Sequence, residues 1–170
     1  MILGMSLPTF TLFHVVLSLI GIAAGFVALF GLFRSKPPSG WTTLFLSTTI
    51  LTSVTGYFFP ANRIPPSHIV GAVSLLVLAV AVVALYRFRL VGAWRWIYVV
   101  AAIAALYLNV FVGVVQAFLK IQPLHALAPT QSEPPFAIAQ GIVLLAFIVI
   151  GFVAIRRFHP DGGTQTLRAA

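Results

Sequence analysis

The sequence predicts an all-α integral membrane protein, a bundle of five transmembrane helices. The 170-residue chain is 61% hydrophobic and only 7% charged, which is too little charge for the surface of a water-soluble domain. Its apolar residues fall into five continuous runs, at 12–33, 41–59, 68–86, 96–119 and 136–155. At about 1.5 Å per helical residue each run reaches roughly 28 to 36 Å, which matches a hydrocarbon core of about 30 Å.

Each run is predicted to be a helix, because it is continuous where a membrane barrel strand would alternate. The first run has no basic segment before it and is followed by basic residues, so a retained span is expected rather than a signal peptide. Proline, which the first turn of a helix tolerates, precedes three of the other runs. These pairs are Pro37-Pro38, Pro65-Pro66 and Pro134-Pro135.

Residues 1–158 are predicted to form a single transmembrane domain, because no loop is long enough to hold another. The longest loop, 120–135, contains several prolines and is expected to be an ordered lid. Residues 159–170 are polar and are predicted to be a flexible cytoplasmic tail.

Basic residues gather in the loops on one side of the predicted bundle. Eight lie after the first, third and fifth runs, and two lie at the opposite ends of the helices. The eight are Arg34, Lys36, Arg87, Arg89, Arg95, Arg156, Arg157 and Arg168, and the two are Arg63 and Lys120. Cytoplasmic loops carry the excess of Lys and Arg, so the N-terminus is predicted outside and the C-terminus in the cytoplasm. This distribution accounts for the net charge of +8 without a nucleic-acid partner.

Catalytic motifs are missing from the sequence, and an enzyme is not expected. There is no cysteine, which excludes disulfides and thiol chemistry. No Asp or Glu lies in any run, and no glycine-rich phosphate loop or HExxH motif occurs.

Polar residues concentrate in the outer leaflet of the predicted bundle, whereas the cytoplasmic half is almost wholly apolar. His14, Thr55, Gln116 and Gln140 are predicted at this depth, with His68 at the boundary and Asn109 nearer mid-depth. His125 lies in the outer loop. Polar side chains within the membrane are costly, so a shared layer is a hypothesis for a functional site.

The polar layer has two possible interpretations, a ligand-binding one and a structural one. Neutral imidazole is a good ligand for haem iron, copper or zinc, so His14 and His68 could hold a b-type haem, with His125 as an alternative ligand. The three histidines could instead bind one copper or zinc ion. In the other reading the histidines are interface residues, and Asn109, Gln116 and Gln140 hydrogen-bond neighbouring helices.

The stretch 107–140, with NVFVGVVQAFLKI followed by HALAPTQSEPPFAIAQ, resembles a group of small bacterial inner-membrane proteins without an assigned activity. The resemblance implies a multi-pass protein of the bacterial inner membrane. Two further segments look like the histidine-bearing helices of haem-binding membrane proteins. They are FHVVLSLIGIAAG, which contains His14, and SHIVGAV, which contains His68.

Three functions follow as expectations. The first is a non-catalytic interaction or structural role, in which small-residue faces such as Gly21 and Gly25 bind a partner membrane subunit or a second copy of the chain. The second is a b-type haem or metal-binding redox protein. The third is a small-solute transporter.

Overall fold

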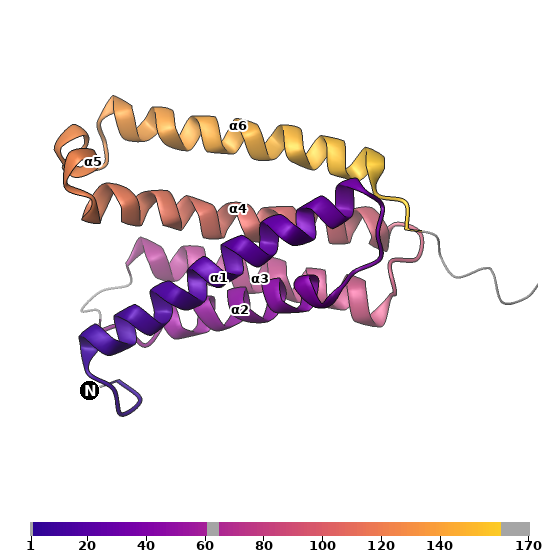
Figure 1. Ribbon diagram of the computed structural model, residues 1–170, viewed down its shortest axis with the longest axis horizontal. Coiled ribbons are helices and arrows are strands. Elements are labelled where there is room, and N and C mark those ends of the chain that lie inside the picture. The colour runs from indigo at the N-terminus through magenta and orange to yellow at the C-terminus, as the bar shows by residue number, and fades with distance from the viewer. Residues whose placement is uncertain (1, 61–64, 161–170) are drawn as a thin grey trace, which may run out of the picture.

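The computed structural model describes residues 2–60 and 65–160, which form helices and no strand. The five long helices are α1 (Leu7–Phe33), α2 (Gly40–Gly56), α3 (Pro66–Val82), α4 (Trp94–Lys120) and α6 (Pro134–Arg157). A π-helical segment, η1 (Val83–Arg87), continues α3, and a short helix, α5 (Gln122–Leu127), connects α4 to α6. The long helices run back and forth along one axis of an elongated bundle (Figure 1).

Capping residues explain why the helix ends differ from the predicted boundaries. The Ser6 hydroxyl accepts a hydrogen bond from the Thr9 N–H at 3.4 Å, so α1 begins at Leu7 rather than residue 12. Pro66 and Pro134 are the first residues of α3 and α6. Proline fits there because it has no N–H, and an N–H in the first turn of a helix would have no partner within the helix. Hydropathy alone defined the predicted ends, and hydropathy does not include capping.

Within residues 2–60 and 65–160, four helices are long and apolar enough to cross a membrane: α1, α3 with η1, α4 and α6. The predicted second span, α2, has 17 residues and ends at Gly56 instead of residue 59. At about 1.5 Å per residue it reaches roughly 25 Å, slightly less than a hydrocarbon core of about 30 Å. The all-helical architecture and its suitability for a lipid bilayer are confirmed. The five spans and their orientation remain predictions.

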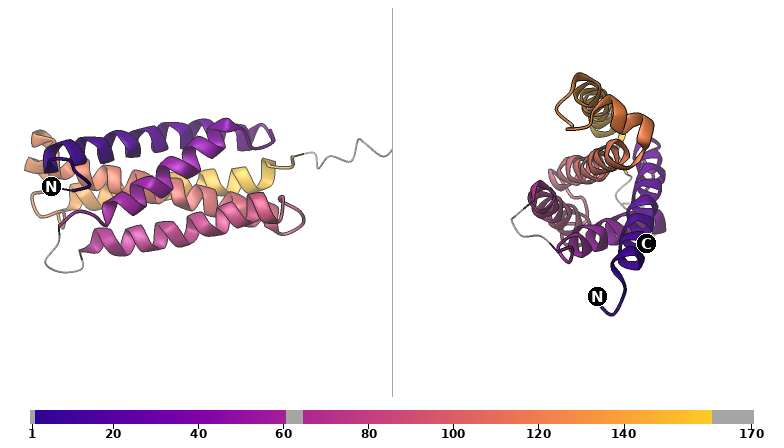
Figure 2. Two further views of the ribbon diagram at one scale, coloured as in Figure 1. Left: turned by 90° about the horizontal axis from the view of Figure 1, so that it is seen from below. Right: turned by 90° about the vertical axis from the view of Figure 1, so that its left-hand side faces the viewer.

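Helices α1 to α4 form a closed ring in which each packs on the next and α1 also contacts α4. Helix α6 lies at the edge of this ring, mainly against α4, as the end-on view shows (Figure 2). Gly25 is a point of close approach in α1. A Cβ there would lie 2.5 Å from Leu106 Cδ1 and 2.9 Å from Phe45 Cδ2. The GxxxG face of α1 is therefore used inside the chain, against α2 and α4.

Basic residues collect at one end of the bundle, where α1 and α6 end and α2 and α4 begin (Figure 1). Among the described residues these are Arg34, Lys36, Arg87, Arg89, Arg95, Arg156 and Arg157. We call this the basic end. Lys120 and Glu133 lie at the opposite end, where α4 ends and α6 begins. Arg63, Arg168 and the tail from residue 161 lie outside the described residues.

Candidate functional site

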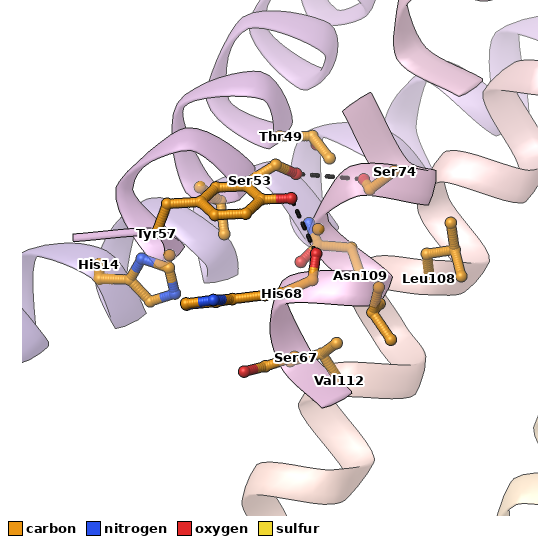
Figure 3. A pocket seen from close by; sticks show the side chains of 14 residues that line it. His14, Thr49, Ser53, Tyr57, Ser67, His68, Ser74, Leu108, Asn109 and Val112 are labelled. Atoms are coloured by element: carbon orange, nitrogen blue, oxygen red, sulfur yellow. Dashed lines mark hydrogen bonds between the residues drawn. The ribbon is translucent and has the colours of Figure 1, made fainter. Parts of the chain in front are cut away.

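A cavity of about 90 Å³, drawn from close by in Figure 3, is lined by residues of helices α1 to α4. Its lining residues place it inside the α1–α4 ring, toward the end opposite the basic end. All four helices contribute to its lining. His14 comes from α1, Thr49 and Ser53 from α2, His68 from α3 and Asn109 from α4. The two histidines predicted as the principal ligands, 54 residues apart in sequence, therefore line one cavity.

His14 is half-buried and is oriented by a hydrogen bond to the end of α2. Its Nδ1 lies 2.8 Å from Thr55 Oγ1, and the Thr55 hydroxyl donates to the Thr52 carbonyl at 3.1 Å. Because a hydroxyl has one proton, Thr55 Oγ1 accepts from His14, and Nδ1 carries the imidazole proton. The lone pair is then on Nε2. A histidine whose tautomer is defined in this way is typical of metal ligands.

His68 lies in the first turn of α3 and is positioned by Tyr57. The two rings pack with their centroids 4.9 Å apart, and the Tyr57 hydroxyl donates to the His68 carbonyl at 2.8 Å. A Cβ at Gly71 would lie 3.3 Å from the Tyr57 ring, so the missing side chain lets the tyrosine lie against α3. In Figure 3 the His14 and His68 rings point toward one another.

Two buried polar groups in the cavity lining have no hydrogen-bond partner in the described part of the chain. They are the Thr49 hydroxyl and Asn109 Nδ2, in residues that are 1% and 7% exposed. The other end of the Asn109 amide is occupied, because Ser18 Oγ donates to Asn109 Oδ1 at 3.0 Å. Leaving a buried polar group unpaired costs about 1–3 kcal/mol, so these groups favour a polar occupant of the cavity.

Glycine at position 21 lets these polar groups approach α1. A Cβ on Gly21 would lie 3.1 Å from Asn109 Nδ2 and 3.2 Å from Thr49 Oγ1. The face of α1 that contains His14, Ser18 and Gly21 therefore lies along the cavity and the polar groups beside it. The small residue at this position makes room for a polar cluster inside the chain.

Of the other residues in the predicted polar layer, some lie at the cavity and others do not. Thr55 positions His14, and Asn109 lines the cavity. Gln140 is buried between α6 and α4, where its Nε2 donates to the Phe111 carbonyl at 3.2 Å. This is the kind of interhelical hydrogen bond expected if the polar residues hold neighbouring helices together. Gln116 is exposed on α4 and does not line the cavity.

His125 is exposed on α5 and does not join the other histidines. The lid segment is ordered, because Gln131 Nε2 donates to the Val115 carbonyl at 2.9 Å, but it packs beside α4. Within residues 2–60 and 65–160 no three His, Cys, Asp or Glu side chains are close enough to hold one metal ion. In the described part of the chain, His125 is therefore not close enough to His14 and His68 for the three histidines to bind one ion.

Several cavity residues were absent from the sequence-based candidates. Thr49, Ser53 and Tyr57 recur every fourth residue on α2, and residues at this spacing share one helix face. Ser53 Oγ also donates to Ser74 Oγ of α3 at 3.1 Å. The four-residue spacing of these polar side chains is a usable sequence signal for a shared helix face.

The size of the cavity discriminates between the predicted cofactors. Pockets for organic ligands measure roughly 300–1,000 Å³, and a b-type haem does not fit in about 90 Å³. A metal ion or a few water molecules do fit. The available donors, two imidazoles with nearby hydroxyl and amide groups, suit copper or zinc better than calcium or magnesium.

No family model matches this chain, and comparisons with curated proteins and with solved structures found no similar chain. The bacterial inner-membrane origin implied by the resemblance of residues 107–140 therefore stays a prediction.

Proposed function

We propose that the chain is a non-catalytic, multi-pass membrane protein that binds a copper or zinc ion between His14 and His68. The observation that carries the proposal is the hydrogen bond from His14 Nδ1 to Thr55, which leaves the Nε2 lone pair available beside a cavity that His68 also lines. Imidazole nitrogen is a preferred ligand of both metals. Thr55 and Tyr57 act as positioning residues.

Monovalent copper suits the cavity better than divalent zinc. Among the described residues that line the cavity there is no carboxylate and no thiolate, so these residues do not neutralise the charge of the ion. The cost of taking an ion out of water rises with the square of its charge, so the neutral site favours the singly charged ion. Zn²⁺ also prefers three or four protein ligands, and two imidazoles supply only part of that set.

The same proposal includes five spans, with α2 crossing the bilayer. Helix α1 ends at the basic end, whereas α3 begins at the opposite end (Figure 1). The chain must therefore return along the bundle between them, and α2 is the segment that does so. The positive-inside rule assigns the basic end to the cytoplasm, which gives an outer cavity and an external N-terminus.

Binding is favoured over the other two expected functions. The Gly21–Gly25 face packs within the chain, which removes the sequence feature that supported a partner subunit. Transport would require a polar path through the bundle. Toward the basic end the α1–α4 ring is instead filled by buried apolar side chains such as Leu29, Phe45 and Leu78.

The decisive experiment titrates the purified protein in detergent with Cu⁺, under reducing conditions with a competing chelator, and separately with Zn²⁺. We expect one ion per chain, abolished by His14→Ala and by His68→Ala. Thr55→Val should weaken binding by roughly 10- to 100-fold, as the loss of a group that orients a ligand does.

His125→Ala is the matched control, because His125 is at the same end of the bundle but outside the cavity. It should bind like the unaltered protein. The proposal fails if His14→Ala retains full affinity, or if His125→Ala loses as much affinity as His68→Ala. Haem added to the same preparation should produce no Soret band, and a band that His14→Ala removes would restore the haem alternative.

A further inference from the structure

A second cavity, of about 340 Å³, lies at the basic end between the end of α1 and the start of α2. Residues of both helices and of the loop between them line it. They include Phe30 and Gly31 of α1, Arg34 and Lys36 of the loop, and Trp41 of α2. We call this cavity the basic groove. No residue is shared between it and the histidine cavity.

The lining of the basic groove changes from apolar to cationic along one direction. Val27 and Phe30 are 42% and 61% exposed on one side of α1, and Arg34 follows one turn after Phe30. Trp41, which is 52% exposed, lies at the same level as the loop, where interfacial aromatics are found in membranes. An occupant with an apolar tail and an anionic head would match this sequence of surfaces.

Among the described residues, no carboxylate lies at the basic end to pair with the cations of the groove. Glu133, the one acidic residue within the described ranges, is at the opposite end of the bundle, where its carboxylate accepts hydrogen bonds from Thr130 and Ser132. Other basic residues at this end have contacts of their own. The Arg156 guanidinium lies 4.2 Å from the centre of the Phe152 ring, and Arg95 donates to the Phe158 carbonyl.

The loop that carries Arg34 and Lys36 is held in place before any ligand arrives. The Ser35 hydroxyl donates to the Arg157 carbonyl at 3.1 Å and accepts from the His159 N–H. The Lys36 N–H donates to the Gly31 carbonyl at 3.0 Å. Because the loop is already ordered, little further conformational entropy is lost on binding.

We propose that the basic groove binds one anionic phospholipid, with its phosphate between Arg34 and Lys36 and an acyl chain along Phe30 and Gly31. A Cβ on Gly31 would have no atom within 4 Å, so glycine leaves the acyl-chain part of the groove open. Cationic side chains beside an interfacial tryptophan are a recurrent setting for anionic lipid heads. The inference is independent of the metal site.

The experiment measures lipid binding to the full-length protein in neutral detergent by native mass spectrometry. Phosphatidylglycerol and phosphatidylcholine with identical short acyl chains are titrated separately, and glycerol phosphate serves as the head group alone. We expect phosphatidylglycerol to bind roughly 25-fold more tightly than phosphatidylcholine, since each of the two basic residues near the anionic lipid contributes about a factor of five. Glycerol phosphate should bind far more weakly, because it lacks the acyl chains.

Two variant pairs separate a built groove from a diffuse positive field. Arg34→Gln with Lys36→Gln should lower the affinity for phosphatidylglycerol by roughly 25-fold. Arg156→Gln with Arg157→Gln removes the same charge at the same end and should change it less than about twofold. Gly31→Leu should block the groove, whereas Gly141→Leu, at another open helical position, should not.

Equal losses in the two double variants would overturn the groove in favour of a diffuse field. So would equal binding of the two lipids, undiminished binding by Gly31→Leu, or binding of glycerol phosphate as tight as that of phosphatidylglycerol. The charge-conserving pair Arg34→Lys with Lys36→Arg should retain the lipid. That variant keeps the test valid if the glutamine variant unfolds.

Discussion

Thr48 and Thr49 are neighbours in α2, but their hydroxyl groups have different surroundings. The Thr48 hydroxyl donates to the Leu44 carbonyl of its own helix at 2.7 Å. The Thr49 hydroxyl is buried, lines the histidine cavity and has no partner in the described chain. A buried hydroxyl without a partner reduces the stability of the folded protein unless a ligand or a water molecule forms a hydrogen bond with it.

Thr49→Val should therefore leave the ligand-free protein as stable or up to about 1 kcal/mol more stable, because it removes an unpaired group without changing the volume. It should also weaken metal binding at the cavity. Thr48→Val is the matched control and should cost about 0.6 kcal/mol, the average for a hydrogen bond within a membrane protein. Reversible unfolding in mixed detergents measures both. A larger loss from Thr49→Val than from Thr48→Val would mean that an ordered water already satisfies Thr49.

The helices are held together by close packing of small residues and by side-chain hydrogen bonds between neighbours. Helix α1 approaches α2 and α4 at Gly25, where Phe45 and Leu106 fill the space that a side chain would take. Both of these side chains are 2% exposed, so neither can move into solvent or lipid to relieve a contact. The Ser53–Ser74 hydrogen bond links α2 to α3 in the same ring.

Gly25→Ala should consequently destabilise the bundle by about 1–2 kcal/mol, since overpacking a filled core typically costs this much. The added methyl group would separate α1 from α2 and α4. Gly141→Ala is the control, because a Cβ there would meet no atom within 4 Å. It should be neutral or slightly stabilising through helix propensity. Detergent unfolding of both variants is the measurement, and equal stabilities would contradict the close approach of α1.

The molecule as a whole is asymmetric along its long axis. The seven described cations of the basic end lie at one extremity of the bundle, and the histidine cavity lies toward the other. A bilayer would distinguish these extremities through the positive-inside rule. Whether α2 crosses the membrane also determines whether the two termini lie on opposite sides.

Five spans predict an external N-terminus and a cytoplasmic C-terminus. A reporter that is active only outside the cytoplasm should therefore work when fused ahead of residue 1 and fail when fused after residue 160. A fluorescent protein that matures only in the cytoplasm should give the opposite result at the same two positions. Termini on the same side of the membrane would contradict the crossing of α2 and leave four spans.

The free energy of moving a residue from water into lipid depends mainly on that residue alone. Hydropathy and charge along the chain were therefore enough to predict the helices and their approximate ends. They were also enough to predict that Arg34, Lys36 and Arg157 lie at one end. The depth of His14 and His68 followed from the same reasoning. The sequence could not give the rotation of each helix about its axis. Gln116 and Gln140 were predicted at similar depth, yet one is exposed and the other buried.

The cavity itself depends on tertiary contacts. Helix rotation is determined by side chains of other helices, as where Gly25 meets Phe45 and Leu106, and no local pattern encodes such long-range packing. Only the folded bundle places the Thr55 hydroxyl against His14 and thereby defines its tautomer. The amino-acid sequence by itself determined a helical membrane protein with one basic end. The tertiary structure decided which of its polar residues share a cavity, because that choice depends on how the helices cross.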